Sequence, residues 1–208
     1  QAFNVNTDNT NLSGQLTLAF KAASQINTYA TYSTNYKSVG LNLGGLPTAN
    51  GEVLLDLATI KPEYVKHLEV GIKTTPTPGT TLNLTIYNTD IKDYQTQVQT
   101  AEVGVNRGYL ANAEKVRIRG VEFDGNSKLN NHFLFNGSLA YTDGIYVSFK
   151  NAPVPLEEVG GPSAFKDISG GELPGISKWT GSLGGEFATP SVFLGAAGKF
   201  FVALDGYY

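Results

Sequence analysis

Apolar and polar side chains alternate along most of this chain with a period of two residues. The clearest example is 133–142, where Phe133, Phe135, Leu139 and Tyr141 alternate with mostly small or polar residues. Such alternation puts one kind of side chain on each face of a β-strand. Eight segments of this kind predict an all-β fold of antiparallel strands. The predicted ranges are Ser13–Lys21, Ile26–Lys37, Val65–Thr74, Thr80–Gln97, Asn112–Lys128, Phe133–Thr142, Ser177–Phe187 and Ser191–Tyr208.

The links between these segments alternate strictly between short and long. The short links are predicted at Ala22–Gln25, Pro76–Gly79, Leu129–Asn131 and Thr189–Pro190. The long links are predicted at Ser38–Glu63, Val98–Ala111 and Val147–Ile176. A transmembrane β-barrel has this rhythm, with tight turns on one side of the membrane and long loops on the other.

Aromatic residues gather near the ends of the predicted strands, as the interfacial girdles of a membrane barrel require. They are Phe20, Tyr36, Tyr94, Phe133, Tyr141, Trp179 and Phe187.

The segment 112–123 keeps its alternation on both sides of Gly120 but slips by one residue across it. Its apolar positions are Val116 and Ile118, then Val121 and Phe123. A glycine at such a slip predicts a β-bulge at Gly120.

Charged residues of the same segment are expected to face a polar barrel interior. An arginine turned towards lipid would cost about 2 to 4 kcal/mol near the bilayer midplane. We expect a structural network of charges in the lumen, and contact with a plug or a passing substrate is the alternative role. The predicted network is Glu69, Arg117, Arg119, Glu122, Lys178 and Glu186.

Composition excludes several other classes of function. The formal net charge is −3 and no basic stripe is present, so nucleic acid is not expected as a partner. The chain has no cysteine, which excludes disulfides and thiolate metal sites. No stretch of 18 apolar residues predicts a transmembrane helix.

No pattern predicts catalysis, a metal site or a cofactor, and the chain is not expected to be an enzyme. His67 and His132 lie far apart, the first as a polar interior residue and the second as a turn residue. The carboxylates Glu157 and Glu158 fall in a predicted loop, where solvation explains them. Ser163 lacks the G-x-S-x-G setting of a nucleophile elbow.

The loop ends of the strands are the expected recognition surface, because loops on a rigid scaffold commonly bind ligands. The loop from Ser38 is apolar for a solvated segment, and we expect it to pack on a plug, a ligand or another loop. The candidate ligand-binding residues on this side are Tyr36, Lys37, Tyr94, Arg107, Tyr109 and Tyr146.

Five stretches, in order, resemble barrel strands of the TonB-dependent outer-membrane receptors, and the local phrasing resembles receptors of Bacteroidota. These stretches are Ile60–Lys73, Tyr87–Gln95, Ala113–Phe123, Gly137–Gly144 and Ser169–Leu183. The last of them resembles the family's L-P-x-x-P/S-K-W segment.

The resemblance implies part of a 22-stranded barrel in the bacterial outer membrane, surrounded by lipid. Its implied partners are its own plug domain, the TonB–ExbB–ExbD complex and a scarce nutrient, most often a ferric siderophore. No stretch resembles a plug, and eight strands fall far short of 22. We therefore expect residues 1–208 to be one internal part of the receptor barrel.

Two other interpretations remain open. The first is a complete eight-stranded outer-membrane barrel acting as a channel or adhesin. The second is a soluble β-sandwich that binds a ligand. A small barrel would close its first strand onto its last, and a sandwich would bury its apolar faces between two sheets.

Overall fold

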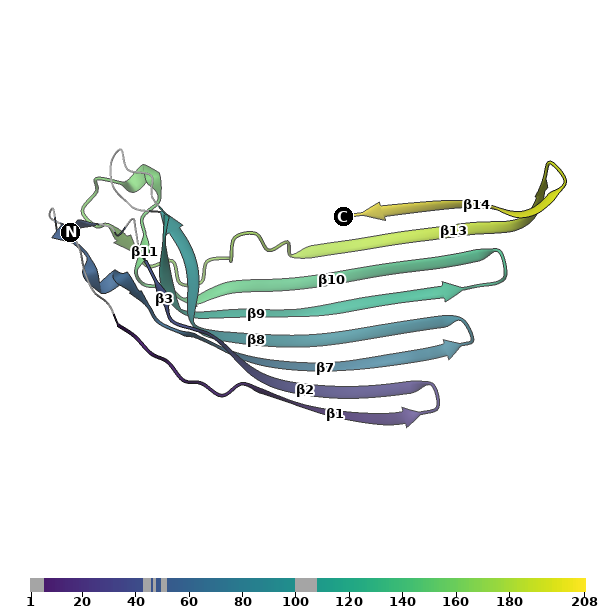
Figure 1. Ribbon diagram of the computed structural model, residues 1–208, viewed down its shortest axis with the longest axis horizontal. Helices are drawn as coiled ribbons and strands as arrows, with labels where there is room; N and C mark the ends of the chain where they lie inside the picture. Colours follow the sequence, from purple (N-terminus) through teal and green to yellow (C-terminus); the bar gives the residue numbers. More distant parts are fainter. Residues whose placement is uncertain (1–5, 43–45, 47, 50–51, 100–107) are drawn as a thin grey trace.

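The computed structural model describes residues 6–42, 46, 48–49, 52–99 and 108–208. Eight strands form one antiparallel sheet in which neighbours in sequence are neighbours in space (Figure 1). They are β1 (Gly14–Ala23), β2 (Ile26–Lys37), β7 (Glu63–Thr77), β8 (Thr80–Gln99), β9 (Gly108–Lys128), β10 (Phe133–Ser148), β13 (Trp179–Phe193) and β14 (Ala196–Tyr207).

The remaining elements are short and belong to the long connections. They are β3 (Gly40–Leu41), β4 (Thr48–Ala49), β5 (Glu52–Val53), η1 (Leu55–Ala58), β6 (Thr59–Ile60), β11 (Ala152–Pro153), η2 (Leu156–Glu158) and β12 (Phe165–Lys166). The four tight turns of the large sheet lie at one end, and the long connections lie at the other (Figure 1). The eight predicted strands and the segregation of short from long links are confirmed.

The predicted link at Thr189–Pro190 is wrong. Strand β13 continues through Pro190, and the chain turns at Leu194 and Gly195, whose φ angles are 51° and 80°. Two successive positive φ angles are typical of the tight turn that joins twisted strands. The register of β13 with β10 ends at Phe187, so Pro190 lies where β13 pairs with β14 alone. A proline is tolerated on such a free strand edge.

The sheet has one apolar and one polar face. Because its register runs without a break through the middle of the strands, side chains opposite one another share a face across all eight strands. Val70 and Ile86 are 51% and 54% exposed, so this apolar face is not covered by protein. The apolar band includes Leu18, Phe20, Leu68, Val70, Ile72, Leu84, Ile86, Val121, Phe123, Phe133, Phe135, Leu139, Tyr141, Trp179, Leu183, Phe187, Val202 and Leu204.

The band has the height of a hydrocarbon layer. On β10 it extends from Phe133 to Tyr141, which is close to the length of strand that crosses a membrane at a tilt. Aromatic pairs mark both edges: ring centroids are 5.0 Å apart for Phe133 and Phe187, and 4.9 Å for Tyr141 and Trp179. Two of the predicted girdle residues, Tyr36 and Tyr94, lie beyond the band towards the long connections.

No bulge occurs at Gly120, contrary to the sequence-based prediction. The pairing of β9 with β8 runs unbroken from Thr80 opposite Ser127 to Lys92 opposite Lys115. The slip in the pattern instead marks the edge of the apolar band. Within the band, the apolar residues of β9 are Val121 and Phe123, which are on the outward face. Beyond the band, they are Val116 and Ile118, which are on the opposite face, under the long connections.

This register also corrects the predicted placement of the arginines. Arg117 and Arg119 share a face with Val121 and Phe123, whereas Glu122 lies on the opposite, polar face. Arg119 lies in the row of Leu68, at the loop-side edge of the apolar band, and Arg117 lies one row beyond it, so neither arginine is at the centre of the band.

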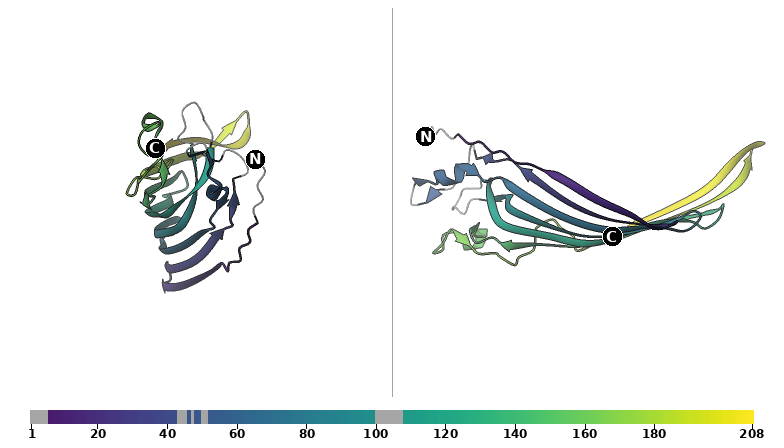
Figure 2. Two further views of the ribbon diagram at one scale, coloured as in Figure 1. Left: turned by 90° about the vertical axis from the view of Figure 1, so that its left-hand side faces the viewer. Right: turned by 90° about the horizontal axis from the view of Figure 1, so that it is seen from below.

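The sheet is curved and open (Figure 2). Within the described residues, β1 pairs only with β2 and β14 only with β13, so the eight strands do not close into a small barrel. Within the described residues, no second sheet packs on the apolar face, which argues against a β-sandwich.

Candidate functional site

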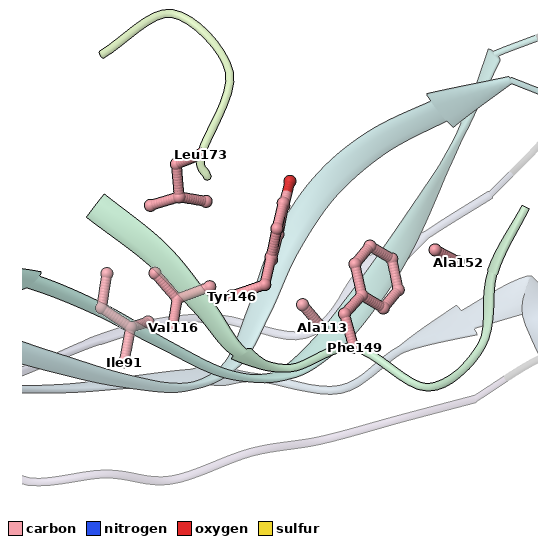
Figure 3. Close-up of a cluster of buried hydrophobic side chains, with 7 residues drawn as sticks. All are labelled: Ile91, Ala113, Val116, Tyr146, Phe149, Ala152 and Leu173. Atoms are coloured by element: carbon pink, nitrogen blue, oxygen red, sulfur yellow. The ribbon is translucent and has the colours of Figure 1, made fainter. Parts of the chain in front are cut away.

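A buried apolar cluster holds the connection 149–178 against the end of the sheet (Figure 3). Strands β8, β9 and β10 contribute one part of it, and the connection 149–178 contributes the other. The cluster consists of Ile91, Ala113, Val116, Tyr146, Phe149, Ala152 and Leu173. Val116 is fully buried here, which explains why β9 carries apolar residues on its polar face at this level.

Backbone hydrogen bonds pair the last part of the connection 149–178 with the edge of β10. Tyr146 N–H donates to Gly171 O, and Leu173 N–H donates to Gly144 O, each at 2.9 Å. Thr142 N–H donates to Lys178 O at the same distance. The connection therefore occupies the edge of β10 up to the point where β13 begins, and its position relative to the wall is fixed.

A turn in this connection contains a hydrogen-bonded carboxylate. The hydroxyl and backbone N–H of Ser169 donate to Asp167, and these hydrogen bonds lower the pKa of the exposed Asp167 carboxyl below its usual range. The stabilisation is present above the ordinary pKa and is lost as the pH falls through the lowered one. At neutral pH this turn is therefore in its stable form.

The connection 38–62 is attached by a buried amide. The side chain of Asn42 donates to Leu57 O at 2.8 Å and to Leu110 O at 2.9 Å, and it accepts from Leu110 N–H at 2.9 Å. The backbone N–H of Asn42 also donates to Ala58 O. The Asn42 side chain thus pairs with backbone groups as a neighbouring strand would, and it joins this connection to β9.

Two further amides tie the same connection to the sheet. Gln95 donates through its side chain to Ser38 O at 2.8 Å and to Lys61 O at 3.1 Å. Asn112 accepts from Lys61 N–H at 2.9 Å and donates to Asp93 O at 2.7 Å. We refer to Asn42, Gln95 and Asn112 as the amide anchor.

Loss of the amide anchor is expected to release the connection 38–62. Asn42→Ala leaves three backbone groups without their partner, at a cost of about 1 to 3 kcal/mol for each buried group. We expect limited proteolysis of the full receptor to cleave this connection at least about fivefold faster while the barrel stays folded. Asn126→Ala, at an exposed position of the same sheet, is the matched control and should leave the cleavage rate unchanged. Equal rates for both variants would contradict the anchoring role.

The polar face carries a hydrogen-bonded network in the middle of the wall. The Tyr29 hydroxyl donates to Glu69 Oε1 at 2.7 Å and lies 3.2 Å from Thr85 Oγ1. His67 Nδ1 lies 2.8 Å from Thr89 Oγ1, and its Nε2 lies 3.5 Å from Glu69 Oε2. The expectation that His67 is a polar residue on the inner face and His132 a turn residue agrees with the structure.

Gly120 provides space for a tyrosine rather than a bulge. Tyr87 lies over it from the neighbouring strand, with its hydroxyl 3.1 Å from Thr142 Oγ1. A Cβ at Gly120 would stand 2.5 Å from the Tyr141 carbonyl oxygen and 2.6 Å from the Tyr87 hydroxyl oxygen.

Filling this space is expected to destabilise the wall. Gly120→Val should cost about 1 to 3 kcal/mol through overpacking, because one of the atoms in the way is backbone. The measurement is the urea midpoint of the reconstituted receptor. Gly14→Val is the control, since nothing lies within 4 Å of a Cβ there. An unchanged midpoint for Gly120→Val would contradict this close packing.

The predicted ligand-binding residues fall at the loop end, but they differ in accessibility. Tyr109 and Tyr146 are only 4% and 6% exposed, and Tyr94 is half-buried against the apolar cluster. Tyr36 and Lys37 are exposed at the loop end of β2, but the register places Tyr36 on the outward face and Lys37 on the polar face. Arg107 lies outside the described residues.

The predicted network of lumen charges does not form as one cluster. Arg119 pairs with Asp143 at 3.0 Å, on the face opposite Glu69 and Glu122. Glu186 lies 3.4 Å from Lys199, and Lys178 pairs with Glu172. The predicted face of the two arginines is wrong because it assumed a shift of face at Gly120, whereas Glu69, Glu122 and Glu186 do lie on the polar face.

The described part of the chain contains no group of three or more His, Cys, Asp or Glu residues that could hold a metal ion. None of its helices is long and apolar enough to cross a membrane. A hollow of about 510 Å³ lies over the apolar side chains of β10, β13 and β14 and belongs to the band, away from the loop end.

The sheet, its two faces and its two ends define a piece of membrane-barrel wall. A model of the TonB dependent receptor-like β-barrel family matches residues 1–208. The chain belongs to this family of TonB-dependent receptor barrels. A comparison with curated protein sequences found no match.

Solved structures share this fold at low sequence identity. The copper transporter OprC is 18% identical with a TM-score of 0.61, covering 84% of this chain and 24% of that one. The ferric yersiniabactin uptake receptor FyuA from Yersinia pestis is 17% identical with a TM-score of 0.60, covering 93% and 29%. The siderophore receptor PiuA from Acinetobacter baumannii is 19% identical with a TM-score of 0.57, covering 92% and 28%. The chain thus spans less than a third of each of these proteins.

Proposed function

We propose that this chain is part of the barrel wall of an outer-membrane receptor that imports a scarce nutrient, namely a ferric siderophore or a similar iron complex. The observation that carries this proposal is the apolar band, which continues across all eight strands on one face while the other face is polar. A wall of this kind separates lipid from a wet interior.

Further support comes from family membership and from the solved structures. FyuA is a ferric yersiniabactin uptake receptor, PiuA is a siderophore receptor and OprC is a copper transporter. In the proposed receptor, the TonB–ExbB–ExbD complex supplies energy and a plug domain fills the lumen. The loop end of the wall faces the outside and takes part in ligand binding, with Lys37 as the exposed candidate on the polar face. Tyr94, Tyr109 and Tyr146 hold the loops that surround the ligand.

The direct test is uptake by cells that lack the receptor gene. Radioactive iron supplied as a panel of purified ferric siderophores should enter wild-type cells and fail to enter the deletion strain for at least one complex. Uptake should return with the complete gene and should stop when TonB is deleted. If the deletion strain takes up every iron complex as fast as the wild type does, although the receptor is located in the outer membrane of the wild type, the proposal of an iron complex as the substrate is wrong.

A further inference from the structure

One residue inside strand β8 has a backbone conformation that is foreign to strands. Asp93 has a φ angle of 53°, although its neighbours Lys92 and Tyr94 pair with β9 in one continuous register. This left-handed conformation is uncommon for residues other than glycine, and it persists only where the surroundings enforce it. Strands β8 and β9 turn away from the line of the sheet towards their loop end (Figure 1). Asp93 therefore marks a bend in β8.

Beyond this bend, β8 and β9 form an arm that has left the wall. The pairing of β8 with β7 ends at Lys92, and the pairing of β9 with β10 ends at Lys115. Within the described part of the chain, residues 93–99 and 108–114 pair as strands only with each other. We call these residues the β8–β9 arm. Because an isolated pair of strands is marginally stable, the direction of the arm depends on its other contacts.

Side chains hold the bend in place. Asn112 lies on the facing strand, and its Nδ2 donates to the Asp93 carbonyl oxygen at 2.7 Å. Past the end of the β7 pairing, Glu63 Oε2 accepts from the N–H of Gln95 at 2.9 Å in a buried position. The Asp93 carboxylate lies 3.9 Å from the ammonium group of Lys92, which is too far for a hydrogen bond. The backbone conformation at position 93, and not the charge, is thus the feature that these contacts support.

Both described long connections contact the β8–β9 arm. The backbone N–H and carbonyl of Leu110 pair with the side chain of Asn42, in the connection 38–62, at 2.9 Å each. Tyr94 packs against the apolar cluster of Figure 3, which includes residues of the connection 149–178. A change in the direction of the arm would therefore move both connections together.

We propose that Asp93 and Asn112 are positioning residues for nutrient capture at the loop end. The left-handed conformation at Asp93 sets the direction of the arm, and Asn112 holds that conformation. This proposal rests on the proposed function, because it takes the loop end as the place where the nutrient binds. Aspartate, asparagine and glycine adopt the left-handed conformation far more readily than a β-branched residue does. A valine at position 93 should therefore misplace both connections and weaken capture.

The functional test measures uptake by cells that carry the complete receptor. The probe is iron-55 bound to each siderophore of the uptake panel. Asp93→Val should raise the half-saturating concentration at least about fivefold and leave the maximal rate per receptor within about twofold, because the arm acts on capture. Asp93→Asn and Asp93→Gly should keep the wild-type half-saturating concentration, since both residues tolerate the left-handed conformation. The matched control is Lys92→Val, at an exposed position of the same strand, and it should keep this value too.

A distance measurement tests the same inference without any ligand. Spin labels at positions 97 and 126 report the distance between the arm and the wall by pulsed electron paramagnetic resonance; both positions are exposed. Any cysteine elsewhere in the complete receptor is replaced by serine. Asp93→Val should shift or broaden the distance distribution, whereas Asp93→Asn should reproduce that of the wild type.

The outcomes separate this proposal from the import function. A wild-type distance in Asp93→Val, or a shifted distance with an unchanged half-saturating concentration, overturns the positioning role and leaves the import function standing. If Asp93→Asn loses affinity as Asp93→Val does, the carboxylate is the active feature and the proposal is wrong. If the wild type takes up no ferric siderophore, iron import is wrong, and the label distances alone decide whether Asp93 sets the arm. Should Asp93→Val fail to fold, Asp93→Ala replaces it in both measurements, with the same direction of change expected.

Discussion

Phe123→Arg is expected to prevent most of the receptor from reaching the outer membrane in folded form. Phe123 is in the apolar band, in the row of Leu84 and Leu139, where an arginine at membrane depth costs about 2 to 4 kcal/mol. That cost is a large part of the stability of a typical domain. The measurement is the amount of heat-modifiable receptor in isolated outer membranes.

The control for this variant is the next residue of the same strand. Glu122→Arg puts the same side chain on the polar face, where water is available. It should leave the folded amount within about twofold of the wild type, since surface substitutions usually change stability by less than about 0.5 kcal/mol. An equal loss of folded receptor in the two variants would contradict the assignment of lipid to one face of the wall and water to the other.

Phe149→Ala is expected to detach the connection 149–178 from the end of the sheet. Phe149 is 2% exposed, its ring centroid is 5.2 Å from that of Tyr146, and its backbone oxygen accepts from Ile168 N–H. Removing a buried phenyl ring costs about 3 to 5 kcal/mol, which exceeds what a surface connection can lose while staying ordered. Hydrogen exchange of residues 165–176 should become at least about tenfold faster, measured by mass spectrometry on the reconstituted receptor.

The matched control is Leu156→Ala in the same connection. Leu156 is 72% exposed, so exchange should be unaffected. If ligand binding depends on ordered loops, Phe149→Ala should also weaken it, whereas Leu156→Ala should not. Unchanged exchange in Phe149→Ala would show that the cluster in Figure 3 does not hold the connection.

The strands and the loop rhythm were predictable because both are local. Alternation such as that of 133–142 is visible within ten residues, and Pro78-Gly79 marks the turn between β7 and β8 directly. The misplaced last turn has a local cause too. Pro190 is usually a strand breaker, and only the free edge of β13 makes it acceptable there.

The contacts at the loop end could not be predicted in the same way. Asn42 bonds to Leu110, 68 residues further along the chain, and an asparagine in a loop gives no local sign of such a partner. The side taken by Arg117 and Arg119 depends on where the membrane band ends and where loops begin to cover the polar face. Both are properties of the assembled wall, and a single strand pattern fits either a bulge or a change of surroundings.

The most direct test of the central claim is a spin-label scan of β10. Residues 1–208 contain no cysteine, so single cysteines at positions 133–142 can each carry one label, with any cysteine elsewhere in the complete receptor replaced by serine. Collision with oxygen, which concentrates in hydrocarbon, is compared with collision with a water-soluble nickel chelate. The apolar-band assignment predicts a period of two, with oxygen favoured at Phe135, Leu139 and Tyr141 and the chelate favoured at Asn136 and Ser138. The opposite phase, or uniform access of the chelate to both faces, would contradict it.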